Sequence, residues 1–366
     1  MVDIVARDLS FRYPGAQAAT LEALSFEVAS NSTLALLGSS GAGKTTLLKL
    51  LSGLLPRAQG SLAFDGKEVL GLPAGERGVS QVFQFPVLYE SLSVLDNIAF
   101  PLRALGFGKR ERTDRARAIA ELLEIDDWLL ERPAKLALFQ AQIAGFAKAL
   151  VRPDTALVLL DEPLTAVEPA LKWRLRGLLK RAQEELQISM IYVTHDQTEA
   201  LTIADRVSVL HDGSILQTGT AAELYNTPQH VEVARFIGSP GMNMVAAKLH
   251  GGVLQIAAAA DRSQRQQPLL DAAAQALADG PVVVGFRPEW ARAELGQQAR
   301  VSGVRVIGAD NGATQGYLEL TLSGERVQLH QALTDTALTP GAGADILLER
   351  ALLFRNDRLV GAMVAR

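Results

Sequence analysis

A glycine-rich segment near the N-terminus has the residue types and the spacing that bind phosphate groups. Residues 38–45, Gly-Ser-Ser-Gly-Ala-Gly-Lys-Thr, fit the pattern G-x-x-x-x-G-K-[ST]. Small side chains let successive backbone N–H groups surround phosphate oxygens at the start of a helix. Lys44 would reach the β and γ phosphates of a nucleotide, and Thr45 would coordinate Mg²⁺. The residues predicted to contact nucleotide here are Gly38, Ser39, Ser40, Gly41, Ala42, Gly43, Lys44, Thr45 and Thr46.

Two carboxylates and one histidine supply the other groups that nucleotide hydrolysis needs. Asp161 and Glu162 end an apolar run, where Asp161 can hold Mg²⁺ through water and Glu162 can polarise an attacking water. Acidic residues at a strand end also serve as helix caps, but the phosphate loop favours the catalytic interpretation. His195 follows another apolar run, from which its imidazole can donate to a γ-phosphate oxygen. A lone histidine is more often a packing residue. The position of His195 after an apolar run, in a chain with a phosphate loop, favours a functional role instead.

The segments that must position these residues alternate between strand and helix. Three short runs, at 33–37, 156–160 and 188–193, are apolar on every face, which is typical of parallel strands covered by helices on both sides. Helical spacing separates and follows them, at 110–123, 141–150, 171–187 and 197–203. The order predicts an α/β fold with a phosphate-binding loop, continuing to about residue 237.

The pattern changes after Gly238-Ser-Pro-Gly241. Short alternating segments separated by glycine-containing turns predict a small all-β barrel domain. The expected strands are 248–256, 281–286, 301–307, 317–322, 325–330, 344–349 and 359–364, with an exposed loop at 261–267 and a short helix at 271–279. We therefore expect one domain at 1–237, with a helical subdomain at roughly 85–155, and a second at 238–366.

Composition excludes several other classes of protein. The 366 residues allow two or three domains at the usual domain size. A formal charge of −4 gives no basic field for nucleic acid, and no cysteine and only 5 histidines argue against disulfides and imidazole metal clusters. No apolar stretch reaches the length of a membrane helix, so a membrane role is expected to be peripheral.

The order of these motifs resembles the ATP-binding cassette (ABC) family along essentially the whole chain. The resemblance implies that Tyr13 stacks on adenine, that Gln84 is the Q-loop residue sensing Mg²⁺ and γ-phosphate, that Glu162 and Lys44 act in catalysis, and that His195 is the switch histidine. The implied cofactors are ATP and Mg²⁺, with Thr45, Gln84 and Asp161 at the metal. Residues 238–243 and 285–289 look like the junction and barrel signature of carbohydrate importers such as the maltose and glycerol-phosphate systems.

One motif departs from the family pattern. The L-S-G-G-Q signature, which grips the γ-phosphate of the facing subunit, falls on Leu136, Ala137, Leu138, Phe139 and Gln140. Ala137 has no hydroxyl, and two large side chains stand where glycines allow close backbone approach. The alternative to a lost phosphate contact is that the loop shifts and another backbone N–H makes that contact. Ile143 also replaces a usual arginine, and Glu168 replaces the usual aspartate of the D-loop.

The sequence thus predicts an ATPase subunit of a bacterial-type importer for a carbohydrate, a polyol such as glycerol, or a related solute. It would act on the cytoplasmic side of the plasma membrane. The expected partners are a second, non-identical ABC ATPase, two permease subunits and, indirectly, a periplasmic solute-binding protein, with no nucleic acid. The alternative functions are a non-hydrolysing regulatory subunit of such an importer and a soluble cassette protein acting on nucleic acid or ribosomes, which the charge does not support.

Overall fold

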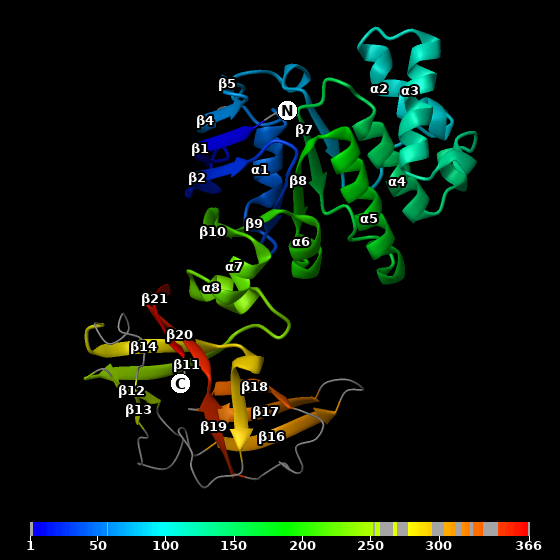
Figure 1. Ribbon diagram of the computed structural model, residues 1–366. Coiled ribbons are helices and arrows are strands. Elements are labelled where there is room, and N and C mark those ends of the chain that lie inside the picture. Colours follow the sequence, from blue (N-terminus) through cyan, green and yellow to red (C-terminus); the bar gives the residue numbers. More distant parts are fainter. Residues whose placement is uncertain are drawn as a thin grey trace. The chain divides into compact units, whose positions relative to one another are not determined.

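The computed structural model describes residues 3–56, 58–251, 253–256, 266–268, 277–294, 304–311, 316–322, 325–331 and 343–364 (Figure 1). Its contacts divide the chain into two compact units, Met1–Ala221 and Ala222–Arg366. The two short helices just before residue 237, Ala221–Asn226 and Val231–Phe236, belong to the second unit except for Ala221. The domain boundary expected from the sequence at 237 stays a prediction.

The first unit contains two sheets. A four-stranded antiparallel sheet has the order β2-β1-β4-β5, and a six-stranded sheet has the order β10-β9-β3-β8-β7-β6. In the larger sheet all neighbours pair in parallel except β10 with β9. The strands are β1 (Ile4–Phe11), β2 (Leu21–Val28), β3 (Thr33–Leu37), β4 (Gln59–Phe64), β5 (Lys67–Glu68), β6 (Val79–Val82), β7 (Leu157–Asp161), β8 (Ser189–Thr194), β9 (Arg206–His211) and β10 (Ser214–Gly219).

Helices connect the strands of the larger sheet, as the alternating pattern predicts. Strands β3 and β8 are buried along their whole length, and β7 is buried up to its last residue, because helices cover the sheet (Figure 1). The helices are α1 (Lys44–Leu51), α2 (Val94–Ala104), α3 (Lys109–Leu122), α4 (Leu138–Leu150), α5 (Pro169–Leu186) and α6 (Gln197–Ile203), with short 3₁₀ turns at Ala74–Glu76, Asp126–Trp128 and Pro133–Lys135.

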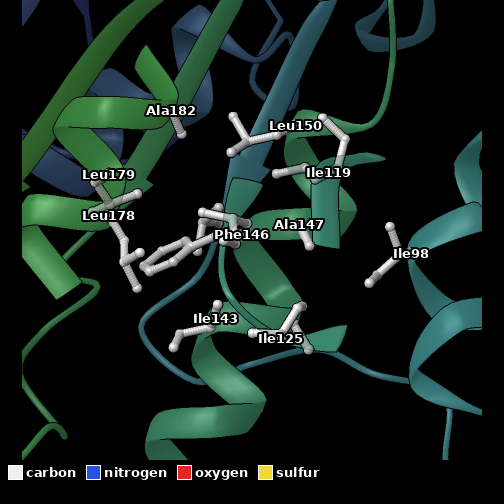
Figure 2. Packing of buried hydrophobic residues seen from close by; sticks show 14 of the residues in the cluster. Ile98, Ile119, Ile125, Ile143, Phe146, Ala147, Leu150, Leu178, Leu179 and Ala182 are labelled. Atoms are coloured by element: carbon white, nitrogen blue, oxygen red, sulfur yellow. The ribbon is translucent and has the colours of Figure 1, made fainter. Parts of the chain in front are cut away.

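The helical region does not have a core of its own. One buried cluster joins α2, α3 and α4 to α5 and to the parallel strands, with Ile98, Phe146 and Leu178 brought together from three helices (Figure 2). Ile143, the residue that departs from the family's usual arginine, is 1% exposed inside this cluster. The substitution therefore replaces a charge by an apolar side chain that the core accommodates.

In the residues that the structure describes, the second unit is built from two sheets and two short helices. The sheet orders are β13-β12-β11-β14-β20-β21 and β15-β19-β16-β17-β18, with antiparallel pairing throughout. The elements are α7 (Ala221–Asn226), α8 (Val231–Phe236), β11 (Asn243–His250), β12 (Val253–Ile256), β13 (Gln266–Pro268), β14 (Gly280–Phe286), a 3₁₀ turn at Pro288–Trp290, β15 (Ala291–Glu294), β16 (Val304–Asn311), β17 (Gly316–Leu322), β18 (Glu325–Gln331), β19 (Gly343–Leu348), β20 (Arg350–Arg355) and β21 (Arg358–Val364).

Arg287 joins the helices of this unit to its sheet. Its guanidinium is fully buried and donates to the backbone carbonyls of Tyr225, Ala234 and Ile237. Burial lowers the pKa of Arg287 to about 10, which still leaves it charged at neutral pH. It also lies over the Tyr225 ring, 4.1 Å from the ring centroid.

Several strand predictions need correction. The single strand expected at 248–256 is two strands, because Gly251 forms a turn between β11 and β12. The sequence analysis missed β4, β5, β6, β9, β10, β15 and β20. β13 covers two residues of the loop expected at 261–267. Residues 261–265, most of the helix expected at 271–279, and 301–303 lie outside the described residues.

Candidate functional site

The predicted phosphate loop lies between β3 and α1 and has the backbone shape that phosphate binding requires. Gly41 and Gly43 have φ values of 84° and 102°, in the left-handed region that favours glycine. A Cβ at Gly43 would also come within 2.6 Å of Leu21, and one at Gly38 would meet the carbonyl of Leu210. Conformation thus favours glycine at 41, lack of space requires it at 38, and both apply at 43.

Lys44 is folded into its own loop. Its Nζ donates to the carbonyls of Gly38 at 2.8 Å and Ser39 at 2.9 Å, and the side chain is buried. Burial lowers the pKa of Lys44, while the charges of Glu162 and Asp161 oppose that shift. A phosphate would offer this ammonium anionic acceptors in place of the two neutral carbonyls.

The strand order brings the four predicted groups to one edge of the sheet. Strands β3, β8, β7 and β6 are parallel neighbours, and their carboxyl ends carry the phosphate loop, His195, Asp161 with Glu162, and Gln84 respectively. Val82 pairs with Leu160, so Gln84 follows β6 at the same end at which Asp161 closes β7. The sequence identified each group, and the strand pairing assembles them.

Glu162 and His195 are in direct contact. His195 Nδ1 lies 3.1 Å from Glu162 Oε2, and the Thr165 hydroxyl donates to the same oxygen at 3.2 Å. Glu162 has a φ of 45°, unusual for a residue with a side chain, and its N–H donates to the carbonyl of Val193. Strain of this kind is common where a functional group must be aimed.

Asp161 lies in a partly desolvated, negatively charged position. Burial raises its pKa first, and the neighbouring Glu162 carboxylate raises it further, while Lys44 acts in the opposite direction. A divalent cation here would relieve the repulsion between the two carboxylates. The arrangement therefore fits a metal as well as a nucleotide.

Tyr13 lies beside the phosphate loop. Its hydroxyl is 3.3 Å from Thr46 Oγ1, and its ring packs edge-on against Phe11 at a centroid distance of 4.9 Å. About a third of the residue is exposed, which leaves ring surface for a base to stack on. Its predicted role in adenine stacking stays a prediction.

The segment 136–140, which departs from the family's signature motif, lies at the start of α4. Ala137 occupies the N-cap position and has no side-chain acceptor, although its N–H donates to Gln140 Oε1 at 2.8 Å. Leu138 is 45% exposed, whereas Phe139 and Leu136 pack against the helical core. Partial burial of Phe139 gives this side chain a packing role that glycine would not have.

Sequence reasoning missed three polar residues around His195. Thr165 contacts Glu162, and Glu199 and Lys172 form an ion pair with an O–N distance of 2.8 Å. The signal for Glu199 was its place three residues after Asp196, at the N-terminus of a helix. Lys172 gave no comparable signal.

The comparisons with known proteins agree with this geometry. Residues 21–165 match the family model described as ABC transporter, and residues 238–290 match the MalK OB fold domain. The chain is 35% identical over 338 residues to the sn-glycerol-3-phosphate import ATP-binding protein UgpC of Chromobacterium violaceum, covering 89% of this chain and 87% of that protein. The UgpC of Cereibacter sphaeroides is 36% identical over 314 residues, covering 85% and 86%.

A solved structure also supports the fold. CbiO1 of Clostridium perfringens matches with a TM-score of 0.56 at 23% identity, covering 61% of this chain and 90% of that chain. Fold, site and relatives together define a P-loop ATPase. The chain belongs to the ABC transporter family, as an ATP-binding subunit of the importer type that carries a MalK OB-fold domain. As in that family, its reaction is ATP hydrolysis. Among the described residues no helix is both long and apolar enough to cross a membrane.

Proposed function

We propose that this chain powers the uptake of a small polyol, sugar or phosphorylated polyol by hydrolysing Mg²⁺-bound ATP. The names of the UgpC relatives support glycerol 3-phosphate or a chemically similar solute. The assembly would place the chain on the cytoplasmic face of the plasma membrane, against two permease subunits served by a periplasmic solute-binding protein. The observation that carries the proposal is the convergence of four motifs at the ends of β3, β8, β7 and β6.

The residues divide the chemistry between binding and hydrolysis. Backbone N–H groups of the phosphate loop and Lys44 hold the phosphates, and the Thr45 hydroxyl, Gln84 and Asp161 would hold Mg²⁺. The metal supplies charge neutralisation of the phosphates. Glu162 takes the proton of the attacking water, and His195 donates to the γ-phosphate.

We further propose that the partner ATPase is a different chain. In this family one site combines the phosphate loop of one subunit with the signature of the other. Two copies of this chain would set Leu138 and Phe139 against both nucleotides. A partner with an intact signature would complete the site built on Lys44 and Glu162, leaving the second site weakened by the loss of donors that are worth about 1.5–3 kcal/mol each.

The permease docking site is expected beside Gln84. A pocket of about 260 Å³ is lined by Val82 at the end of β6 and by Phe83, Pro86 and Val87 of the segment that follows. Pro101 of α2 and Lys148 of α4 also line it. Phe85 and Val87 are 63% and 58% exposed. The neighbouring Leu88 packs against the core instead. An exposed apolar cluster beside a pocket fits a short helix of a membrane subunit.

The segment is held rigidly enough to serve as a docking surface. Asn97 accepts from the N–H of Tyr89 and donates to its carbonyl, and Lys148 donates to the carbonyl of Val87. Lys148 Nζ also lies 4.3 Å from the centroid of the Tyr89 ring.

The test is to purify the chain together with the products of neighbouring membrane-protein genes and to measure ATPase with candidate solutes. Stimulation by a polyol phosphate, polyol or sugar is expected. The Glu162→Gln complex should bind ATP and turn over about 10²-fold more slowly. Near-normal turnover of that complex would favour the regulatory alternative. Full activity of the chain purified alone would contradict the asymmetric pairing.

A further inference from the structure

A buried ion pair lies next to the turn that carries His195. Glu199, in the first turn of α6, is 2% exposed, and its Oε1 lies 2.8 Å from Lys172 Nζ on α5. The two residues are 27 positions apart in the chain and come from helices on either side of β8 in the sequence. A carboxylate this deeply buried is stable only while it is fully paired.

The other oxygen of Glu199 is paired with β8. Its Oε2 accepts from the Tyr192 hydroxyl at 3.0 Å and from the Thr194 hydroxyl at 2.9 Å. Burial, followed by the nearby Glu199 carboxylate, raises the pKa of Tyr192 well above its ordinary value. The phenol therefore stays protonated and donates at neutral pH.

These bonds fix the backbone on both sides of His195. The Thr194 hydroxyl, oriented by Glu199, accepts from the N–H of Asp196 at 3.0 Å. Asp196 Oδ1 in turn accepts from the N–H groups of Thr198 and Glu199, which begins α6. Lys172 Nζ also lies 3.9 Å from Asp196 Oδ2. Residues 194 and 196 are thus tied to one buried carboxylate and one ammonium.

His195 itself is half exposed. Its side chain is 54% exposed, and its Nδ1 lies 3.1 Å from Glu162 Oε2. Packing therefore does little to orient this ring. The geometry of its turn must instead be set by the backbone that carries it.

We propose that Glu199 and Lys172 are positioning residues for His195, holding its turn so that the imidazole meets Glu162 and the γ-phosphate. The proposal rests on the roles proposed above for His195 and Glu162. It adds a mechanical link, because α5 follows the loop that begins at Glu162 and ends at Glu168. Lys172 thereby ties the helix after the catalytic carboxylate to the turn of the histidine.

A second ion pair on the same helix provides a matched control. Lys180 Nζ lies 3.2 Å from Asp205 Oδ1, and its side chain is 38% exposed. Lys172→Met and Lys180→Met remove the same charge from α5. In Lys172→Met the residue that loses its ion pair is Glu199, which is linked to the turn of His195. In Lys180→Met that residue is Asp205.

The first measurement uses the full-length chain alone. Selective ¹⁵N labelling of histidine, with His195→Gln to assign its signal, reports the ring of His195. Lys172→Met and the isosteric Glu199→Gln should both shift the His195 ring signals, and Lys180→Met should not. Thermal unfolding of each variant establishes that it is folded. Unchanged His195 signals in folded Lys172→Met and Glu199→Gln would overturn the proposal.

The second measurement uses the assembled transporter. Lys172→Met and Glu199→Gln should lower kcat at least 10-fold with KM for ATP changed less than 3-fold, and Lys172→Arg should retain most activity. A merely structural role would lower Tm without this split between kcat and KM. If the His195 signals shift but neither these variants nor His195→Ala slows hydrolysis, the positioning stands and the proposed role of His195 fails.

Discussion

The N-terminus of α4 allows a single substitution to be predicted in detail. Ala137 has N-cap backbone angles, with φ −63° and ψ 155°, and its N–H already donates to Oε1 of the Gln140 side chain, which is one half of a capping box. The missing half of the capping box is a side-chain oxygen that accepts from the N–H of residue 140. Ala137→Ser supplies that oxygen without changing the backbone.

The expected stabilisation follows from the cap. Replacing alanine by serine at an N-cap is worth about 1 kcal/mol, within a range of about 0.5–2 kcal/mol. For a unit of about 220 residues, 1 kcal/mol corresponds to a rise in Tm of roughly 2–4 °C. Restoring glycine at 139 as well would confuse the test, because loss of a packed Phe side chain and a glycine in the first turn would together cost several kcal/mol.

The same substitution also tests the signature. A serine hydroxyl that accepts from the helix can still donate its proton outward. In the proposed composite site it would give the facing γ-phosphate one charge-assisted donor, worth about 1.5–3 kcal/mol when fully formed. With Leu138 and Phe139 still present, we expect only part of this, as a rise of several-fold in the ATPase of the isolated chain.

The assay is thermal unfolding of the full chain, followed by ATPase. Ala118, exposed within α3, is the control position. Ala118→Ser should lower Tm slightly, since serine is a weaker helix former than alanine. If Ala137→Ser also lowered Tm, or changed it no differently from the control, residue 137 would not cap α4, and the assignment of the signature to 136–140 would lose its support.

Three further sets of substitutions test other parts of the chain. Lys44→Ala removes a phosphate contact and should lower the ATPase rate of the assembled complex by about 10²-fold or more. Glu162→Gln should lower the rate by a similar factor. The Glu162→Gln variant should still bind ATP in an equilibrium binding assay. Phe85→Asp and Val87→Asp should abolish transport while leaving Tm within a few degrees of its original value. The control is Leu54→Asp, at an apolar residue that is 55% exposed outside this segment, which should leave transport intact. Normal transport by both docking variants would show that the permease binds elsewhere. Arg77 is buried and donates to four backbone carbonyls, those of Leu50, Leu51, Leu70 and Leu72. Arg77→Met should therefore lower the free energy of unfolding by about 3 kcal/mol and Tm by roughly 6–12 °C in a thermal melt. A shift in Tm below about 2 °C would show that water satisfies those carbonyls.

Local sequence was sufficient to identify the chemistry of the phosphate loop. The loop, its lysine and the strand and helix around it are contiguous, so residue type and spacing fix their geometry. The runs around 33–37, 156–160 and 188–193 were equally clear, because strands covered on both faces are apolar throughout. Each became a strand within one residue of the expected limits.

Strands with weaker patterns escaped notice. Strand β6 spans only Val79–Val82, and β10 is partly buried along nearly its whole length. Neither has a sequence that alternates apolar and polar residues or that is apolar throughout, as a prediction from sequence requires. Their identity as strands comes from the neighbours with which they pair.

Only the tertiary structure decided which groups meet. The strand order β3-β8-β7-β6 differs from the order in the chain, and it places Glu162 against His195 although the two residues are 33 positions apart in the sequence. The ion pair of Lys172 with Glu199 and the burial of Ile143 depend likewise on how α5, α6 and α4 pack. Hydrophobic periodicity specifies which face of an element is buried, but long-range pairing specifies what that face meets, and the free energy of that choice is shared over the whole core.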